Sequence, residues 1–295
     1  MIAAAGHAFA EEAAPARALA DALGLPLGLV DVHAFPDGEV LPTVPAGART
    51  VIAYRSLHRP NDKLVPLMLA ADAWRRSGVE RLVLAAPYLC YLRQDAVFAP
   101  GQPLSRDVIA GLLGPRFDRL VTVEAHLHRT HDLAAAFDTP AQSLSAAGPL
   151  AAALAGDGPA PFLVGPDVES GPWVAAIADR LGAGSLVFTK ERLGDRSVRL
   201  QAEGLERVQG RRVVVVDDVC SSGGTLLAVA RRLTEAGAAA IEVAVVHALF
   251  DAATEQALRD AGVRRIISTD SIPHPTNAVP LAPLLAQALA DEISP

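Results

Sequence analysis

The chain has 295 residues, enough for two domains of ordinary size, and 51% of them are hydrophobic although only 4% are aromatic. The formal net charge is −7, so the chain lacks the positive surface that nucleic-acid-binding domains need. No apolar run reaches about 18 residues, no signal-peptide pattern is present, and the two cysteines, Cys90 and Cys220, are not arranged as a disulfide framework. We therefore expect a soluble, cytoplasmic protein with no nucleic-acid or membrane partner.

The first part of the chain alternates apolar segments, typical of buried strands, with segments of helical periodicity. Pro15 is expected to start or kink the first helix. Met68 and Trp74 recur with other apolar residues at helical spacing and are expected in the core. Strands are predicted at 1–5, 29–33, 50–54, 81–86 and 119–123, and helices at 8–23 and 63–77.

The composition becomes rich in alanine, glycine and proline over residues 141–161, and we place a domain boundary near residue 144. The second part repeats the alternation of the first, which predicts an α/β fold with parallel sheets and right-handed crossovers. Its predicted strands are 162–165, 186–190, 213–216, 241–249 and 264–269, and its helices are 144–154, 173–181, 226–233, 252–261 and 281–289.

Residues 211–226 read RRVVVVDDVCSSGGTL and place two carboxylates and a small polar loop after a buried strand. Glycines let the backbone approach a phosphate, and the hydroxyls, the N–H groups and the dipole of the following helix favour an anion. The alternative is an ordinary strand-to-helix turn whose Ser and Thr only cap the helix. The adjacent Asp217 and Asp218 favour a binding site, because neighbouring residues of a strand point to opposite sides and can serve two partners.

Three other polar segments follow predicted strands. FPDGE, residues 35–39, marks a turn that exposes two carboxylates, and a hairpin tip is its simplest interpretation. PYLCYLRQD, residues 87–95, is either a surface network or a loop of a site. His126, His128 and His131 lie close together, but a structural zinc site needs about four ligands and no cysteine or histidine partner lies nearby in the sequence.

Six segments of the chain carry a resemblance. VVVVDDVCSSGGTL is similar to the phosphoribosyl-pyrophosphate (PRPP) motif of phosphoribosyltransferases and PRPP synthases, and FPDGE, PYLCYLRQD, EAHLH, GPDVESG and TKER precede it in the order typical of PRPP synthases. The chain thus resembles a divergent branch of the ribose-phosphate pyrophosphokinase (PRPP synthase) family. The resemblance implies two tandem phosphoribosyltransferase-type α/β domains, 1–144 on the ATP side and 145–295 with the sugar-phosphate loop, each a mostly parallel sheet covered by helices. It also implies that the last helix packs on the N-terminal domain.

The resemblance assigns roles to individual residues, in four groups. Those implied to bind ribose 5-phosphate are Asp217, Asp218, Ser221, Ser222, Gly223, Gly224 and Thr225. Those implied to bind ATP are Phe35, Asp37, Gly38, Glu39, Arg93, Gln94 and Asp95. Those implied to be catalytic are Lys190, Arg192 and His126, with Lys190 and Arg192 on a closing flap. Those implied to hold Mg²⁺ are His126 and Asp167.

The chain departs from the family pattern in three motifs. Ser221 stands where many members carry a third acid, which lowers the negative charge around the ribose. Glu124 replaces an aspartate, so its carboxylate is displaced by one methylene. Glu169 and Ser170 replace two glycines, which makes the backbone of that loop less free.

The function implied is transfer of the diphosphoryl group of ATP to O1 of ribose 5-phosphate, giving PRPP and AMP. A homodimer or higher homo-oligomer is implied as well, with an ATP site shared between subunits through Asp37 and Glu39. One alternative is a phosphoribosyltransferase that consumes PRPP, although it would not need the FPDGE and RQD segments. The other is a non-catalytic regulatory homologue, against which His126, Lys190 and Arg192 argue.

Overall fold

The computed structural model describes residues 1–126, 133–156, 158–192 and 198–293, with side chains at all of these positions except 190–192, 198 and 199. The chain divides into two compact units. Unit 1 comprises Met1–Ser145 and Leu281–Pro295, and unit 2 comprises Ala146–Pro280. No helix among the described residues combines the length and apolar character needed to cross a membrane.

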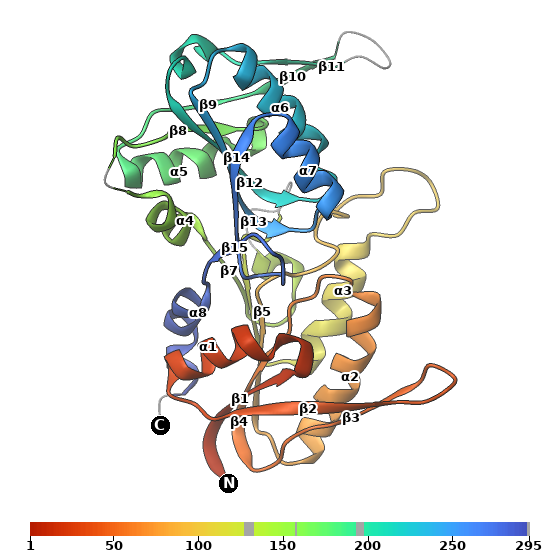
Figure 1. The fold of residues 1–295 in the computed structure, drawn as a ribbon. Helices are drawn as coiled ribbons and strands as arrows, with labels where there is room; N and C mark the ends of the chain where they lie inside the picture. Colours follow the sequence, from red (N-terminus) through yellow and green to blue (C-terminus); the bar gives the residue numbers. More distant parts are fainter. Residues whose placement is uncertain (127–132, 157, 193–197, 294–295) are drawn as a thin grey trace. The chain divides into compact units, whose positions relative to one another are not determined.

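The core of unit 1 is a sheet of seven described strands in the order β3-β2-β1-β4-β5-β6-β7 (Figure 1). All neighbours run parallel except β2 and β3, which form an antiparallel hairpin that projects beyond the other strands. The bounds are β1 Ile2–Phe9, β2 Leu27–Ala34, β3 Val40–Thr43, β4 Ala48–Tyr54, β5 Arg81–Ala86, β6 Arg119–Val123 and β7 Ala141–Leu144.

Helices cover both faces of this sheet. The close approach of α1 to β1 depends on Gly6, since a Cβ there would lie 3.3 Å from the Cβ of Ala20. On the opposite face the fully buried Trp74 of α2 packs in the main apolar core, as the sequence predicted, with Met68 partly buried beside it. The helices are α1 Ala13–Leu23, α2 Asn61–Arg76, α3 Ser105–Leu113 and α8 Ala282–Leu289, and α8 contacts α1. Short 3₁₀ turns are η1 Ala10–Glu12, η2 Gly114–Arg116, η3 Leu133–Ala136 and η6 Ala290–Glu292.

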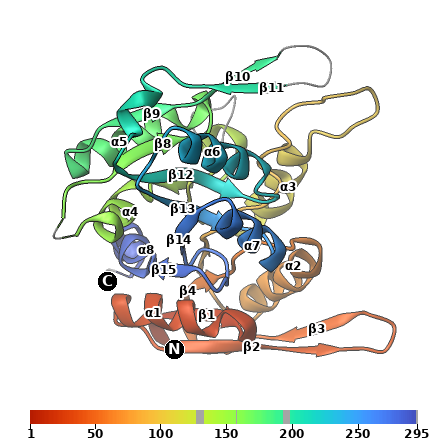
Figure 2. The ribbon, with the colours of Figure 1, turned by 45° about the horizontal axis from the view of Figure 1, so that its top comes forward.

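Unit 2 contains a parallel sheet in the order β15-β14-β13-β12-β8-β9 (Figure 2). Its central strand includes Val213, Val214, Val215 and Val216, all fully buried, because helices cover both faces of the sheet. The bounds are β8 Phe162–Gly165, β9 Ser185–Val187, β12 Arg212–Cys220, β13 Ala240–Ala248, β14 Val263–Thr269 and β15 Asn277–Val279. A separate antiparallel pair consists of β10 Thr189–Arg192 and β11 Val198–Gln201. The helices are α4 Ala147–Leu154, α5 Gly171–Leu181, α6 Gly224–Glu235 and α7 Ala252–Asp260, with 3₁₀ turns η4 Val168–Ser170 and η5 Leu205–Val208.

The predicted α/β class is confirmed, and the bounds of several predicted elements were wrong. Residues 8 and 9 belong to β1 and not to a helix, because their neighbours in β2 and β4 continue the parallel pairing to that point. Residue 144 ends strand β7, and the helix predicted from there begins at Ala147. The predicted strand 186–190 is split into β9, which joins the sheet, and β10, which leaves it. The strands β3, β7, β11 and β15 and the helix α3 were not predicted.

Candidate functional site

Two aspartates lie at the carboxyl end of the central strand of unit 2. β12 continues through Asp217 and Asp218 to Cys220, where the sequence predicted an end at the aspartates, because β13 pairs with it as far as Ala248. On its other side β8 pairs with β12 only as far as Val215. The two carboxylates therefore lie beyond the end of β8, at the edge of the sheet where α/β proteins bind ligands.

A third carboxylate, that of Asp167, acts on Asp217 through its charge. Asp167 follows β8 and begins the turn η4, where its Oδ1 accepts a hydrogen bond from the N–H of Ser170 over 3.3 Å. Burial, together with the negative charges of Asp218 and Asp167, raises the pKa of Asp217 to about 8. Three acidic side chains thus lie close together, and a cation or the hydroxyl groups of a sugar would stabilise their charged forms.

The loop between β12 and α6 has the backbone of an anion site. Gly223, with φ of +69°, is the N-cap of α6, and no side chain caps that end of the helix. A Cβ at Gly223 would collide with Cγ2 of Thr254, whose position is fixed by the cap that Asp251 makes to its N–H over 2.8 Å. Only glycine fits here, for conformational and for steric reasons. The first N–H groups of α6 remain directed toward the loop, as phosphate binding requires.

The proposed flap residues lie in the antiparallel pair outside the main sheet. Lys190 is opposite Leu200 and Arg192 is opposite Val198 in the pairing of β10 with β11. The side chains of Lys190 and Arg192 lie outside the described part of the structure. The two residues thus belong to a hairpin that is separate from the main sheet. The prediction of a single strand 186–190 did not include this separation.

The FPDGE segment forms the tip of the β2–β3 hairpin. Phe35 donates its N–H to the carbonyl of Glu39 over 2.8 Å, and Gly38, with φ of +92°, donates to the carbonyl of Phe35 over 3.0 Å. Asp37 accepts from the N–H of Glu39 over 3.1 Å. Phe35 is 40% exposed, and its ring packs edge to face on His33. The turn therefore presents an aromatic face and two exposed carboxylates at the end of the hairpin.

The RQD segment lies in the loop after β5. Arg93 and Gln94 are exposed, whereas Asp95 is buried. Gln94 accepts a hydrogen bond from the hydroxyl of Ser105, the first residue of α3, over 2.5 Å. Tyr91 has φ of +62°, a strained conformation for a residue with a side chain, and its hydroxyl donates to Asn61 of α2 over 2.8 Å. These contacts fix the loop, on which Arg93 is exposed.

His126 follows β6 in a segment with strained backbone. Glu124 has φ of +38° and its carboxylate accepts from the hydroxyl of Ser145 over 2.7 Å, so this carboxylate is bound within unit 1. His126 is partly buried. His128 and His131, which raised the zinc alternative, lie outside the described residues. Within the described ranges no group of three or more His, Cys, Asp or Glu side chains is placed to hold a metal ion.

Two polar groups of the described structure were not found from the sequence. At the ends of β13 and β14 the buried His247 bonds through Nδ1 to the hydroxyl of Ser271 over 2.9 Å. In unit 1, Glu12, Arg55 and Lys63 are all buried and joined by ion pairs. The available signal was the position of Arg55 directly after a buried strand.

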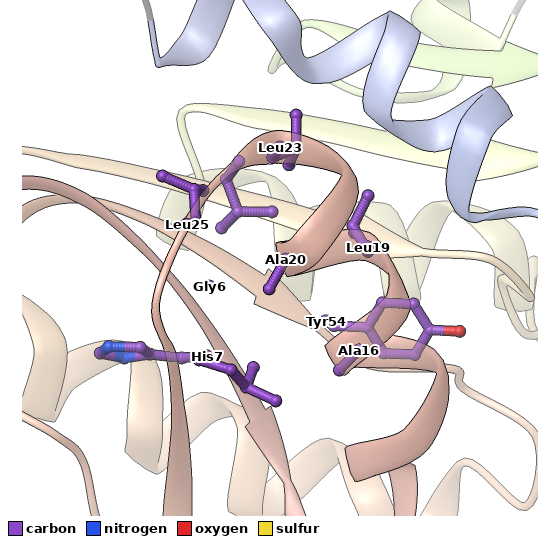
Figure 3. A pocket seen from close by; sticks show the side chains of 10 residues that line it. Gly6, His7, Ala16, Leu19, Ala20, Leu23, Leu25 and Tyr54 are labelled. Carbon is purple, nitrogen blue, oxygen red and sulfur yellow. The ribbon is translucent and has the colours of Figure 1, made fainter.

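A small pocket of unit 1 lies between α1 and the strands β1 and β4 (Figure 3). Its cavity volume is about 10 Å³, room for a single water molecule. Figure 3 shows Ala16, Leu19 and Ala20 of α1 on its wall, while the imidazole of His7 points away from α1. The pocket is a gap in apolar packing and contains none of the predicted site residues.

Cys90 and Cys220 are both buried, and neither forms a disulfide. Burial raises the pKa of the Cys90 thiol to about 12, so it is not a nucleophile at neutral pH.

Parallel sheets of this strand order, with an aspartate pair and a glycine turn leading into a helix, define a protein built on phosphoribosyltransferase-type domains. Residues 139–290 match the family described as the phosphoribosyl transferase domain, and residues 8–115 match the N-terminal domain of ribose phosphate pyrophosphokinase. The chain belongs to the ribose-phosphate pyrophosphokinase family.

Individual relatives agree with this assignment. The chain is 35% identical over 277 residues to the ribose-phosphate pyrophosphokinase of Methanopyrus kandleri, across 92% of this chain and 94% of that protein. It is 34% identical over 278 residues to the enzyme of Halobacterium salinarum, across 93% and 96%. The crystal structure of phosphoribosylpyrophosphate synthetase from Mycobacterium smegmatis has a TM-score of 0.83 with 98% of each chain covered, and at 24% identity it shows the shared fold.

Proposed function

We propose that the protein is a ribose-phosphate diphosphokinase, which transfers the β,γ-diphosphoryl group of ATP to O1 of ribose 5-phosphate and releases AMP. The observation that carries this proposal is the presence in one chain of both domains of the family, one matched over residues 8–115 and the other over 139–290. A phosphoribosyltransferase needs only the second of these. Two relatives, 35% and 34% identical to the chain over more than nine-tenths of its length, are both named ribose-phosphate pyrophosphokinase.

The sugar phosphate is proposed to bind in unit 2. The glycine turn at Gly223 and the uncapped start of α6 favour binding of the 5-phosphate. The carboxylates of Asp217 and Asp218 are proposed to accept hydrogen bonds from the ribose hydroxyls. Accepting hydrogen bonds from hydroxyls stabilises the charged form of a carboxylate, which burial disfavours in Asp217. The sugar is then held at both ends, and O1 is the group left to react.

ATP is proposed to bind to residues of unit 1. The exposed Arg93 offers a planar fork suited to phosphate oxygens, and Phe35 offers an exposed face for the adenine ring. O1 attacks the β-phosphorus, and negative charge on the phosphoryl oxygens must be neutralised in the transition state. Lys190, Arg192 and Arg93 are proposed to supply that positive charge, with His126 beside the phosphates.

Mg²⁺ is the proposed cofactor. Mg²⁺ binds proteins through one or two carboxylates together with substrate phosphates, so it does not require a preformed cluster of three protein ligands. The carboxylate of Asp167, close enough to Asp217 to raise its pKa, fits this requirement. His126 is the other proposed ligand, although its imidazole nitrogen is a weaker partner for a hard cation than oxygen is. The ion would screen the negative charge of the triphosphate when bound.

The decisive experiment measures AMP formed from ATP with and without ribose 5-phosphate. Formation of AMP that depends on ribose 5-phosphate, with PRPP as the second product, is the expected result. Release of pyrophosphate from PRPP and a free base would instead identify a phosphoribosyltransferase. Absence of both reactions would leave the non-catalytic homologue.

We also propose a homo-oligomer in which the hairpin tip with Asp37 and Glu39 completes the ATP site of another subunit. The support is the projection of the β2–β3 hairpin beyond the rest of its sheet. Mixing Glu39→Ala with Lys190→Ala protein should restore up to about a quarter of wild-type activity, because half of randomly formed two-fold dimers are hybrids with one intact pocket. The double variant Glu39→Ala/Lys190→Ala, mixed with itself, is the control. If subunits exchange and no activity returns, the hairpin serves only its own chain or none.

A further inference from the structure

Unit 1 contains a fully buried carboxylate held by three donors. The side chain of Glu12 is 1% exposed, and its Oε1 accepts from Nζ of Lys63 over 2.6 Å and from the N–H of Ser56 over 3.1 Å. Its Oε2 accepts from Nη1 of Arg55 over 3.2 Å. Acidic side chains are almost never buried to this degree unless they are paired, so the burial of Glu12 depends on these three donors.

The donors come from the place in a sheet where anions bind. Arg55 and Ser56 directly follow β4, and Lys63 lies in the first turn of α2, whose N-cap Pro60 makes no side-chain cap. Glu12 ends the turn η1, which follows the adjacent parallel strand β1. Strand ends, a helix amino end and two cations together form a cradle for an oxyanion.

The cradle has a topological counterpart in unit 2. In both sheets the first strand leads through a 3₁₀ turn into a helix of eleven residues, α1 or α5, which ends at a left-handed glycine, Gly24 or Gly182. In unit 1 the chain then forms the outer strand β2 and the antiparallel strand β3 that pairs with it, and in unit 2 it forms the outer strand β9 and the separate antiparallel pair of β10 and β11. In both units the chain then returns to the other side of the first strand, as β4 or β12. β4 therefore corresponds to β12, and the segment between β4 and α2 corresponds to the loop that we propose binds the 5-phosphate.

The two counterparts differ in what fills them. In unit 2 the turn η4 ends at the uncharged Ser170, whose hydroxyl donates back to the carbonyl of Asp167 over 2.6 Å. In unit 1 the equivalent position, the end of η1, is Glu12. We propose that unit 1 contains a second oxyanion cradle, formed by Arg55, Lys63 and the N–H of Ser56, and that the carboxylate of Glu12 is its permanent occupant. Each chain then binds one sugar phosphate and not two. The comparison with unit 2 rests on the proposed function, whereas the occupancy of the cradle by Glu12 does not.

The surroundings of Glu12 show that the cradle would attract an anion if it were emptied. Nε of Arg55 is buried and has no hydrogen-bond partner among the described residues. Glu11 pairs with Arg55, but its side chain is 54% exposed, and among the described residues it forms no ion pair with Lys63. Burial and the charges of Lys63, Arg55 and Arg59 lower the pKa of His58 to about 4, so the imidazole beside the cradle adds no charge near neutral pH. Removing Glu12 would leave Lys63 without an acid partner, facing a space of carboxylate size.

The test is chemical rescue of Glu12→Ala, which removes a fragment the size of acetate. In chloride, the variant should lose roughly 10 °C in Tm, because a buried charge pair is broken. Acetate or inorganic phosphate at equal ionic strength should restore at least half of that loss. Equilibrium dialysis with labelled acetate should find one bound acetate per Glu12→Ala chain and none in the wild type. The double variant Glu12→Ala/Lys63→Met should show no specific gain from either anion.

Each outcome decides the proposal. If acetate and phosphate stabilise Glu12→Ala no more than chloride does, or stabilise the double variant equally, the cradle does not exist. If Glu12→Ala folds only when refolded in acetate, the proposal is supported. If it folds in neither buffer, Glu12→Gln decides, because it keeps the volume of the side chain and removes its charge. A clear loss of Tm in Glu12→Gln relative to the wild type then supports the proposal, and an unchanged Tm overturns it. Formation of AMP is measured separately, so failure here leaves the proposed function untouched.

Discussion

The indole Nε1–H of Trp74 donates a hydrogen bond to Nδ1 of His7 over 2.8 Å, and both rings are buried in unit 1. Nδ1 must therefore keep its lone pair, so His7 is neutral with its proton on Nε2. Burial lowers the pKa of His7 to about 4 from an ordinary value of 6.5. This pair makes the stability of unit 1 depend on pH.

We expect stability to be highest above about pH 6.5 and to fall between pH 6.5 and 4, because the unfolded chain takes up a proton that folded His7 excludes. His7→Gln retains an acceptor for Trp74 and removes the titration. It should reduce the pH dependence by up to about 1.4 kcal/mol per pH unit in this range. Urea unfolding at several pH values, followed by Trp74 fluorescence in a Trp173→Phe background, measures it. An unchanged slope would show that His7 does not titrate as the geometry requires.

Glu292 connects the end of the chain to the sheet of unit 1. It accepts from Arg81 over 2.8 and 3.0 Å and from Arg119 over 2.9 Å, and its side chain is 7% exposed. Glu292→Gln should lower the free energy of unfolding of unit 1 by about 1–3 kcal/mol, because two guanidinium groups lose a charged acceptor. The matched control is Glu80→Gln, whose pair with Arg49 is exposed and should not affect the unfolding midpoint measurably. Equal effects of both substitutions would contradict this role.

Gly223 is the position at which the sugar-phosphate loop should be least tolerant. Gly223→Ala places a Cβ against Thr254 at φ of +69° and should weaken ribose 5-phosphate binding at least tenfold, on the order of 1.4 kcal/mol. Gly24→Ala is the control, because Gly24 has φ of +67° at the end of α1 with no atom near its Cβ position. It should cost about 1 kcal/mol of stability without changing that affinity. Calorimetric titration of both variants decides whether the loop or general strain is responsible.

We expect the two substrates to bind to residues of different units. Arg93→Ala should weaken ATP more than ribose 5-phosphate, and Asp218→Ala should do the reverse, because Arg93 belongs to unit 1 and Asp218 to unit 2. Titration of each variant with each ligand, one at a time, makes the comparison. Equal losses for both ligands would mean that the sites are assigned wrongly.

Lys190→Ala should reduce kcat by about 10² to 10³, since one charge positioned at a developing phosphoryl transition state contributes roughly 3–4 kcal/mol. Ribose 5-phosphate binding should stay close to that of the wild type. Arg232→Ala, which removes an exposed charge from α6, is the control for a general loss of positive charge. A kcat for Lys190→Ala within threefold of the wild type would remove Lys190 from the mechanism.

The strands that could be predicted from the sequence were those whose burial is independent of distant residues. The valines of β12 and the apolar run of β5 are buried on both faces, and continuous hydrophobic residues of that length are typical of central parallel strands. β7 and β15 were missed because they are short edge strands of mixed polarity, which are stabilised by pairing with a neighbour. β10 was merged with β9 because the residue between them, Phe188, is apolar and continues the hydrophobic run of β9, and in the structure it is fully buried.

The sequence by itself determined the fold class, the family and the order of its motifs, because the loops after β5, β6, β8 and β12 carry their chemistry in contiguous residues. The tertiary structure determined which segments, far apart in the sequence, come together. The pairing of β13 with β12 places Asp217 and Asp218 inside a strand, and the packing of α7 puts Thr254 against Gly223. It also brought Glu12 to Arg55 and Lys63, which are 43 and 51 residues away in the chain. A buried ion pair forms only where folding removes water from both partners, so no local sequence pattern predicts it.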